Sequence, residues 1–284
     1  MGSQIKDARR RAAAAAVIAL VLIAGRLSAG QTPAGQTPLG PNQLQTQLRR
    51  LQNGKPDLSG IWQALNTANW DLQTHAARPG PVALGAVGAT PAGIGVVEGN
   101  EIPYLPEAAA QKKENFANRF SADPEIKCYL PGVPRATYMP YPFQIVQTPK
   151  HIMMAYEFAG AARTIFMDKA PASPTDSWMG HSVGRFEGDT LVVDVTSLTD
   201  QTRLDRAGNF HSDALHVVER YTPRSPDALT YSATIEDPKV FSRPWTISMP
   251  LYRRLEKNAQ VLEFKCVEFA EELMYGHLRK QINK

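Results

Sequence analysis

"MGHSVGRFEGDTLVVDV", residues 179–195, has the clearest secondary-structure pattern in the chain. Apolar residues alternate with polar ones in both halves, and Gly188-Asp189 stands between the halves as a two-residue turn of the Gly-X kind. The pattern predicts a β-hairpin in which Glu187 faces Thr190. One face of this hairpin belongs in a core and carries Phe186, Leu191, Val193 and Val195.

The second face of the hairpin carries side chains that can do chemistry. It contains His181, Val183, Arg185, Val192, Asp194 and Thr196. The face is either the solvent-exposed outer side of a sheet or the polar lining of a barrel cavity. In the second case, His181 and Asp194 are diagonal neighbours within reach of each other.

The hairpin belongs to a series of strand candidates spaced about ten residues apart. They cover 58–63, 143–148, 151–159, 163–168, 182–187, 190–196, 214–222, 229–237, 244–255 and 261–270. The short, turn-rich links predict a mostly β fold, an antiparallel meander barrel, with a β-sandwich as the alternative. A Gly/Pro-rich loop is expected at 78–106, a helix at 107–120 and a second short helix at 271–281.

The N-terminal region reads as a targeting segment. Residues 1–29 combine a basic start, an apolar run and a small residue at Ala29, which is typical of a cleaved signal peptide. The sequence therefore predicts a periplasmic or secreted protein, with an uncleaved anchor as the alternative. Residues 30–55 are expected to be a flexible linker, and residues 56–284 a single barrel domain.

Charge excludes two partner classes once the signal peptide is removed. Residues 1–29 hold five of the 31 basic and one of the 27 acidic residues, which leaves 26 of each. A neutral mature chain predicts neither nucleic-acid binding nor a stable membrane anchor after cleavage. The expected partner is a small molecule, and the sequence does not specify the oligomeric state.

Two cysteines, Cys128 and Cys266, lie in the exported part. In an oxidising compartment such a pair forms a disulfide, here closing a loop of about 140 residues and contributing about 4–5 kcal/mol in the chain-entropy model. Two buried thiols are the alternative. Neither cysteine has a C-x-x-C partner, so sulfur ligation of zinc is not indicated.

Candidates for acid–base chemistry gather in residues 196–221. Glu219 shares a face with Leu215, Val217 and Tyr221, so it is either paired with an arginine or has a raised pKa. The catalytic candidates are His181, His211, Glu219, Arg203, Arg185 and Asp194. No metal or cofactor is predicted, because the histidines lack ligand spacing, and Ser182 in GHSVG lacks the strand–turn–helix context of a nucleophile elbow.

Aromatic residues on the predicted strands are the candidates for holding an apolar ligand, although such residues are also usual in cores. They are Tyr141, Phe143, Tyr156, Tyr221, Tyr231 and Trp245.

The segment LSGIWQ, residues 58–63, resembles the Gly-x-Trp at the start of lipocalin-like (calycin) barrels. In those barrels a late arginine packs on the tryptophan. The resemblance therefore implies that Trp62 is covered by Arg253 or Arg254.

A longer set of motifs is similar to a widespread group of exported, largely uncharacterised bacterial proteins. These motifs are PDLSGIW, CYLPGVPRATYMPYPFQIVQTP, RTIFMD, WMGHSVGRFEGDTLVVDV, DRAGNFHSDALHVVERY and IEDPKVFSRPWT, within residues 56–269. The resemblance implies export and a β-rich domain but no reaction. Relatives often carry Cys-His-Glu-Gly-Asn where this chain has Cys266-Val-Glu-Phe-Ala, so chemistry of that histidine is not carried over.

Two functions fit these residues. The first is an exported barrel enzyme, a hydrolase, lyase or isomerase, that acts on a small, partly apolar molecule by acid–base chemistry. The second is a lipocalin-like binding protein for an apolar or aromatic ligand; a structural role in the envelope needs no site. Catalysis requires His181, His211 and Glu219 to converge within hydrogen-bond reach of a cavity.

Overall fold

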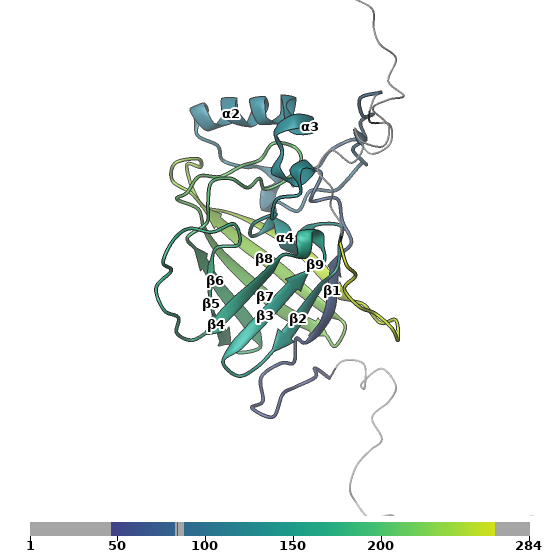
Figure 1. Cartoon of the computed structure of the whole chain (residues 1–284), viewed down its shortest axis with the longest axis vertical. Helices are drawn as coiled ribbons and strands as arrows, with labels where there is room; N and C mark the ends of the chain where they lie inside the picture. The colour runs from purple at the N-terminus through teal and green to yellow at the C-terminus, as the bar shows by residue number, and fades with distance from the viewer. Residues whose placement is uncertain (1–46, 83, 85–87, 265–284) are drawn as a thin grey trace, which may run out of the picture. The chain divides into compact units, whose positions relative to one another are not determined.

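Strands follow one another around a closed barrel in the order of the chain (Figure 1). The computed structural model describes residues 47–82, 84 and 88–264, and this part of the chain contains nine strands. They are β1 (Gly60–Ala64), β2 (Phe143–Gln147), β3 (His151–Tyr156), β4 (Ala162–Met167), β5 (His181–Glu187), β6 (Thr190–Thr196), β7 (His216–Ser225), β8 (Ala228–Glu236) and β9 (Trp245–Arg253). Alternation along the strands buries one continuous apolar face inside the barrel. The predicted barrel is confirmed, and the sandwich does not form.

One neighbouring pair departs from the predicted meander. β4 and β5 run parallel, with Ile165 opposite Ser182, whereas the other eight pairings around the described barrel are antiparallel. A closed barrel with an odd number of strands requires this, because an odd number of reversals cannot restore the starting direction. The long connection 168–180 carries the chain back along the barrel between the two strands.

The opening hairpin has the predicted register. Glu187 lies opposite Thr190, and the pairing continues without a bulge to His181 opposite Thr196. Gly188 has φ of 60°, as the first central residue of a type II′ turn requires. This turn sets which side chains of β5 and β6 face the core.

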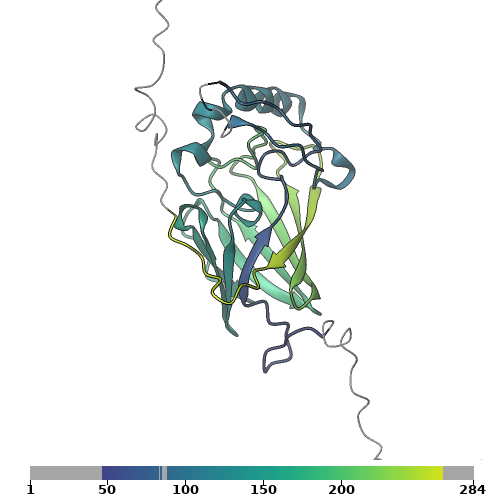
Figure 2. The same cartoon turned by 90° about the vertical axis from the view of Figure 1, so that its right-hand side faces the viewer.

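Helical segments cover one end of the barrel (Figures 1 and 2). They are η2 (Glu98–Asn100), α2 (Pro106–Ala117), α3 (Arg119–Ala122), η3 (Pro124–Lys127) and α4 (Arg135–Tyr138), while η4 (Phe158–Gly160) links β3 to β4. The helix predicted at 107–120 is observed as α2 and α3, because the backbone leaves the helical region at Asn118. Pro106 lies in the first turn of α2. Proline is tolerated there because N–H groups of the first turn make no hydrogen bond within the helix.

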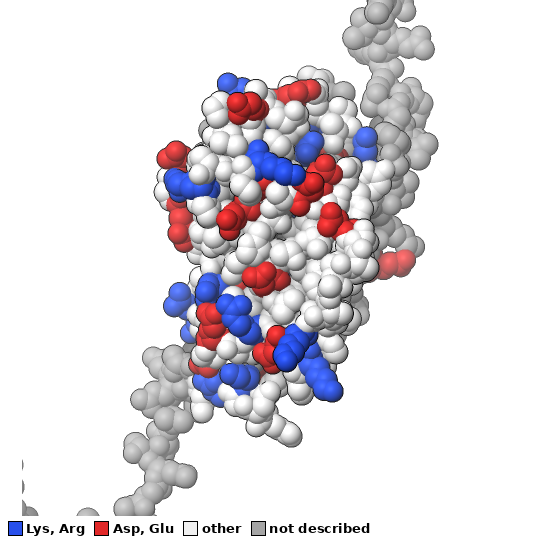
Figure 3. Space-filling view, turned by 90° about the vertical axis from the view of Figure 1, so that its left-hand side faces the viewer, with Lys and Arg blue, Asp and Glu red and all other residues white. Residues whose placement is uncertain are grey.

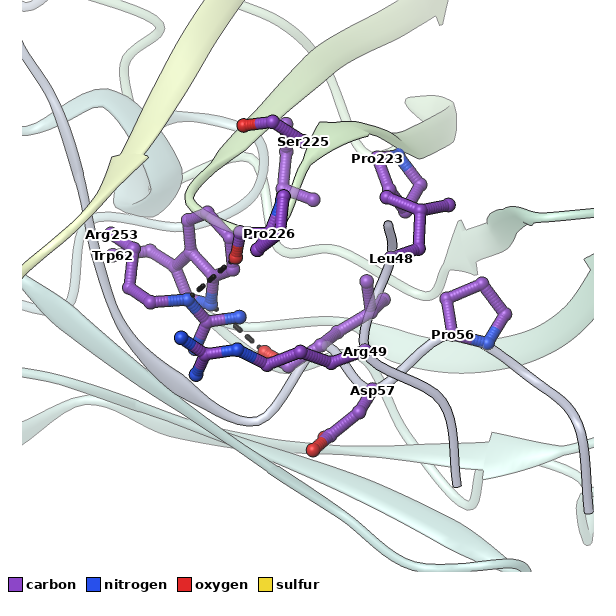
Figure 4. A pocket seen from close by; sticks show the side chains of 11 residues that line it. Leu48, Arg49, Pro56, Asp57, Trp62, Pro223, Ser225, Pro226 and Arg253 are labelled. Carbon is purple, nitrogen blue, oxygen red and sulfur yellow. Dashed lines mark hydrogen bonds between the residues drawn. The ribbon is translucent and has the colours of Figure 1, made fainter. Parts of the chain in front are cut away.

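Trp62 on β1 and Arg253 on β9 stack on each other beside the link between β7 and β8 (Figure 4). The Arg253 guanidinium carbon lies 4.3 Å from the centre of the Trp62 ring, and its Nε donates to the Pro226 carbonyl at 2.9 Å. A second nitrogen, Nη1, donates to the carbonyl of Ser59. Of the two arginines proposed to cover Trp62, Arg253 does so.

Three sequence predictions concern the chain ends. The signal peptide (1–29) and the helix at 271–281 lie outside the described residues. Of the strand predicted at 261–270, residues 261–264 do not form a strand, because β9 pairs directly with β1 and closes the barrel without it. Residues 265–270 lie outside the described part. Within the predicted linker 30–55, Arg50 makes two hydrogen bonds to Asp189, at 2.8 and 2.9 Å.

Candidate functional site

A charged pair lies inside the barrel, where apolar side chains would be expected. Arg163 projects inward from β4 and Glu219 from β7, and Arg163 Nη1 lies 2.7 Å from Glu219 Oε2. A second contact, Arg163 Nη2 to Glu219 Oε1 at 3.1 Å, makes the pair bidentate. Both side chains are almost completely buried, at 2% and 0% exposure. Of the two states predicted for Glu219, the arginine-paired one is confirmed.

Three tyrosine hydroxyls complete this barrel-interior cluster. Tyr221 and Tyr231 each donate to Glu219 Oε1, at 3.0 and 2.8 Å. Tyr156 accepts from Arg163 Nε at 3.0 Å, and its hydroxyl also contacts the sulfur of Met154, at 3.3 Å, and the side chain of Thr137. Unlike Tyr221 and Tyr231, the Tyr156 hydroxyl does not donate to the Glu219 carboxylate, and thioether sulfur is a weak acceptor.

The electrostatics of the cluster favour fixed protonation states. Burial opposes the charge of Arg163, but the Glu219 carboxylate prevails and raises the pKa of the guanidinium above its ordinary value. Burial, reinforced by Glu219, raises the pKa of the Tyr221 and Tyr231 hydroxyls well above their ordinary value. The cluster is therefore a neutral assembly of an ion pair and protonated phenols.

The cluster lies behind the seam between β4 and β5. Ser182 on β5 accepts a long hydrogen bond from Arg163 Nη1, at 3.4 Å. The parallel pairing extends over three positions, from Ile165 to Met167 on β4. Residue 163 itself has no partner on β5, so the barrel wall has few backbone hydrogen bonds beside the cluster.

The polar face of the opening hairpin is the outer surface of the barrel. Arg185 is exposed and pairs with Glu187 at 2.6 Å, and His181 packs its ring against Phe166, with centroids 5.5 Å apart. Asp194 pairs with His216 Nε2 at 3.0 Å. This side of the barrel has intermingled acidic and basic side chains (Figure 3). The alternative that placed these candidates in a cavity lining is wrong.

His211 lies in the loop region that covers the barrel end. Its Nδ1–H donates to the Ser212 carbonyl at 2.9 Å, which leaves Nε2 to accept from the Thr202 hydroxyl at 2.6 Å. Burial lowers the pKa of His211, so the neutral imidazole is favoured. His211, Glu219 and His181 thus lie in three different environments, and the structure does not bring them together as one catalytic site.

Arg203 lies in the same covering region, one residue from Thr202. It forms an isolated antiparallel bridge with Phe210, and its Nη2 donates to Asn115 Oδ1 on α2 at 3.1 Å. Burial lowers the pKa of this guanidinium.

The six aromatic candidates lie in three places. Tyr156, Tyr221 and Tyr231 belong to the barrel-interior cluster, and Phe143 packs against Tyr156 with centroids 5.3 Å apart. The other two lie elsewhere: Tyr141 contacts Phe158 and Phe264, and Trp245 packs against Phe241.

A second buried charge network holds α4 across the barrel end. Arg135 Nη1 lies 3.0 Å from Asp123 and Nη2 lies 2.6 Å from Glu125, which also binds Arg206. Asp205, nearby, accepts from the backbone of Leu72 and from Asn209. Burial raises the pKa of Asp205 to about 7. This network anchors the cover over the barrel-interior cluster.

Sequence reasoning missed Arg163 and Thr202. Arg163 was signalled in RTIFMD, where it takes the inward position of a strand two residues before Ile165. Thr202 had no local signal, because its partner His211 is fixed by the bridge between Arg203 and Phe210.

Other binding features are few in the described part. No group of three or more His, Cys, Asp or Glu side chains there is arranged to hold a metal ion. Among the same residues, no helix has the length and apolar character needed to span a membrane. Cys266 lies outside the described residues, so its pairing with Cys128 stays a prediction. A small recess beside Trp62 and Arg253 is lined by Arg49, Asp57 and Pro226 (Figure 4).

Comparisons with protein-family models, with curated proteins and with solved structures found no match.

Proposed function

We propose that this chain is an exported, lipocalin-like binding protein for a small, partly apolar, uncharged molecule that enters the barrel. One observation carries the proposal: a bidentate ion pair and three tyrosine hydroxyls converge inside the barrel wall. Burying two charges costs several kcal/mol per ion, and apolar residues of similar volume often stabilise a fold better. A polar centre in an otherwise apolar interior is therefore more useful for recognition than for stability.

The chemistry of the cluster suits binding better than proton transfer. Oε1 of Glu219 accepts from Arg163 and two phenols, whereas Oε2 lies 2.7 Å from Arg163 Nη1 in the ion pair and has no hydrogen-bond partner. The cluster has no net charge, which favours a neutral ligand with a hydroxyl or carbonyl group. The Tyr156 hydroxyl, which contacts the Met154 sulfur and Thr137 and not the carboxylate, is the donor best able to change partners.

The proposed entry is the β4–β5 seam. It has the three-position parallel pairing and is bordered by the connection 168–180. By contrast, the cover over the barrel end is tied down by Arg135 through Asp123 and Glu125. Opening the seam breaks fewer buried charged contacts than lifting α4 does. Export to the periplasm or outside the cell is part of this proposal and rests on residues 1–29.

Calorimetric titration with phenol and benzyl alcohol tests the proposal, beside native mass spectrometry of the protein purified without denaturation. We expect saturable binding by the wild type and at least tenfold weaker binding by Tyr156→Phe. Tyr252→Phe is the matched control, because Tyr252 is 43% exposed on β9. Circular dichroism verifies that both variants fold. Absence of binding by the wild type, or equal binding by the Tyr156 variant, contradicts the proposal.

An acid–base enzyme is the second candidate, and it rests on the 2.6 Å contact between Thr202 Oγ1 and His211 Nε2. A neutral histidine that accepts a hydroxyl proton is the arrangement that activates a nucleophile. Its test is hydrolysis of 4-nitrophenyl acetate: a rate lost in both Thr202→Val and His211→Gln but kept in His151→Gln favours this candidate. Equal rates in the wild type and all three variants exclude it for ester substrates.

A further inference from the structure

Arg203 differs from the other arginines that are drawn into the fold. Arg135, Arg163, Arg206 and Arg253 each have a carboxylate oxygen within 4.0 Å. Within the described residues, Arg203 takes part in no such ion pair, and its one side-chain hydrogen bond goes to the neutral amide of Asn115. A half-buried guanidinium has five N–H donors, so most of them have no protein acceptor.

The position of Arg203 is fixed by close packing. The segment 203–210 folds back on itself through the Arg203–Phe210 bridge, and Gly208 at its tip has φ of 86°. A Cβ at Gly208 would lie 2.6 Å from the backbone nitrogen of Phe116, so the tip is pressed against α2. Asn115 also donates to the Gly208 carbonyl at 3.3 Å. The guanidinium is therefore held at α2 and is not free to seek a distant carboxylate.

Two further arginines, Arg78 and Arg119, contact the ring of Phe116, which follows Asn115 on α2. They lie over the ring, at 5.5 and 4.0 Å from its centre. Neither is in an ion pair within the described part of the chain; Arg119 donates to the Phe116 carbonyl at the helix end. The C-terminal half of α2 is thus bordered by three arginines that form no ion pair within the described residues, and it carries one acidic residue of its own, Glu114.

Asp123 and Asp200 attract the Arg203 guanidinium from a distance, but neither forms an ion pair with it. Asp123 is engaged bidentately by Arg135, at 3.0 and 3.2 Å. Asp200 is exposed and accepts from Gln201. Arg203 is half-buried, and none of its nitrogens is both buried and without a hydrogen-bond partner, so its unpaired N–H groups are open to solvent, where an anion can reach them.

We propose that Arg203, with the Asn115 amide beside it, is a binding site for the oxyanion group of a small molecule, a phosphate or a carboxylate. A guanidinium fork matches either group with two parallel hydrogen bonds. The Asn115 side chain donates to Gly208 and holds Arg203 through its oxygen. This site lies in the region that covers the barrel end, and its ligand is charged, so it is separate from the proposed neutral ligand of the barrel interior.

The test is a titration followed by NMR on the arginine Nε–H signals. Inorganic phosphate and sodium acetate are added separately at constant ionic strength, with chloride as the balancing ion. We expect a saturable shift of the Arg203 signal with a Kd in the millimolar range, about −4 kcal/mol. The anion that binds more tightly distinguishes a phosphate site from a carboxylate site.

The variants Arg203→Gln and Arg243→Gln are matched in charge, and Arg243 is exposed. Anion affinity should fall at least tenfold in Arg203→Gln and stay unchanged in Arg243→Gln. Gln at 203 keeps a donor for Asn115 and removes an unpaired charge, so its Tm without anion should equal or exceed that of the wild type. No saturable shift with either anion, equal affinity in Arg203→Gln, or a lower Tm for that variant overturns the proposal.

Discussion

Removing the charge of Glu219 should destabilise the fold strongly, although the shape of the side chain is kept. In Glu219→Gln, the guanidinium of Arg163 remains 2% exposed and has no counter-ion. If the amide nitrogen takes the position of Oε2, two donors face each other, because Arg163 Nη1 lies 2.7 Å from that position. Tyr221 and Tyr231 both donate to the other oxygen, so turning the amide over does not relieve the conflict. Breaking a buried pair from one side costs about 3–5 kcal/mol.

Urea unfolding followed by tryptophan fluorescence measures this loss, which corresponds to a Tm lower by roughly 6–20 °C for a chain of this size. The exposed pair Arg185–Glu187 supplies the control, because Glu187→Gln should cost less than about 1 kcal/mol. The double variant Arg163→Met with Glu219→Leu should recover most of the stability, since no unpaired charge remains. A loss in Glu219→Gln no larger than in Glu187→Gln would refute this reasoning.

Three other predictions concern Asp205, Arg253 and the two cysteines. Burial raises the pKa of Asp205 from 3.8 to about 7 in the folded protein. Its protonated carboxyl therefore contributes stability that is full below about pH 4 and is lost as the pH rises through 7. Asp205→Asn should remove this pH dependence from the free energy of unfolding measured between about pH 4 and 8. Arg253→Ala should cost about 2–4 kcal/mol by losing the Trp62 stack and two carbonyl contacts, whereas the exposed Arg254→Ala should cost under about 1 kcal/mol; equal losses in urea unfolding would contradict this. Non-reducing peptide mass mapping should find Cys128 joined to Cys266, and reduction should cost about 4–5 kcal/mol; unmodified thiols in both peptides of the exported protein would exclude the bond.

The hairpin was predictable because local chemistry determines it. The two-residue turn at Gly188-Asp189 leaves one register, and a slip would move Leu191 and Val193 to the wrong face. The contact between Trp62 and Arg253 was implied by the resemblance to lipocalin-like barrels, which left Arg254 as the alternative.

Three features could not be predicted because they depend on distant contacts. The parallel β4–β5 pair follows from the number of strands in the closed barrel, which no single segment encodes. The sequence could not decide which side of the barrel wall His181 takes, because the polar face of the hairpin also carries the apolar residue Val192. In the structure Val192 is as fully buried as the core residues of β6. Arg163 and Glu219 are 56 residues apart, and only barrel closure brings them together.

The barrel-interior cluster as a ligand site is tested most directly by NMR of the protein with ¹³C-labelled tyrosine rings during a phenol titration. The account predicts saturable shifts for Tyr156, Tyr221 and Tyr231, whereas the exposed Tyr252 stays constant. Shifts confined to Tyr252 or other surface tyrosines, or no shift of the three interior rings at saturating phenol, would contradict it.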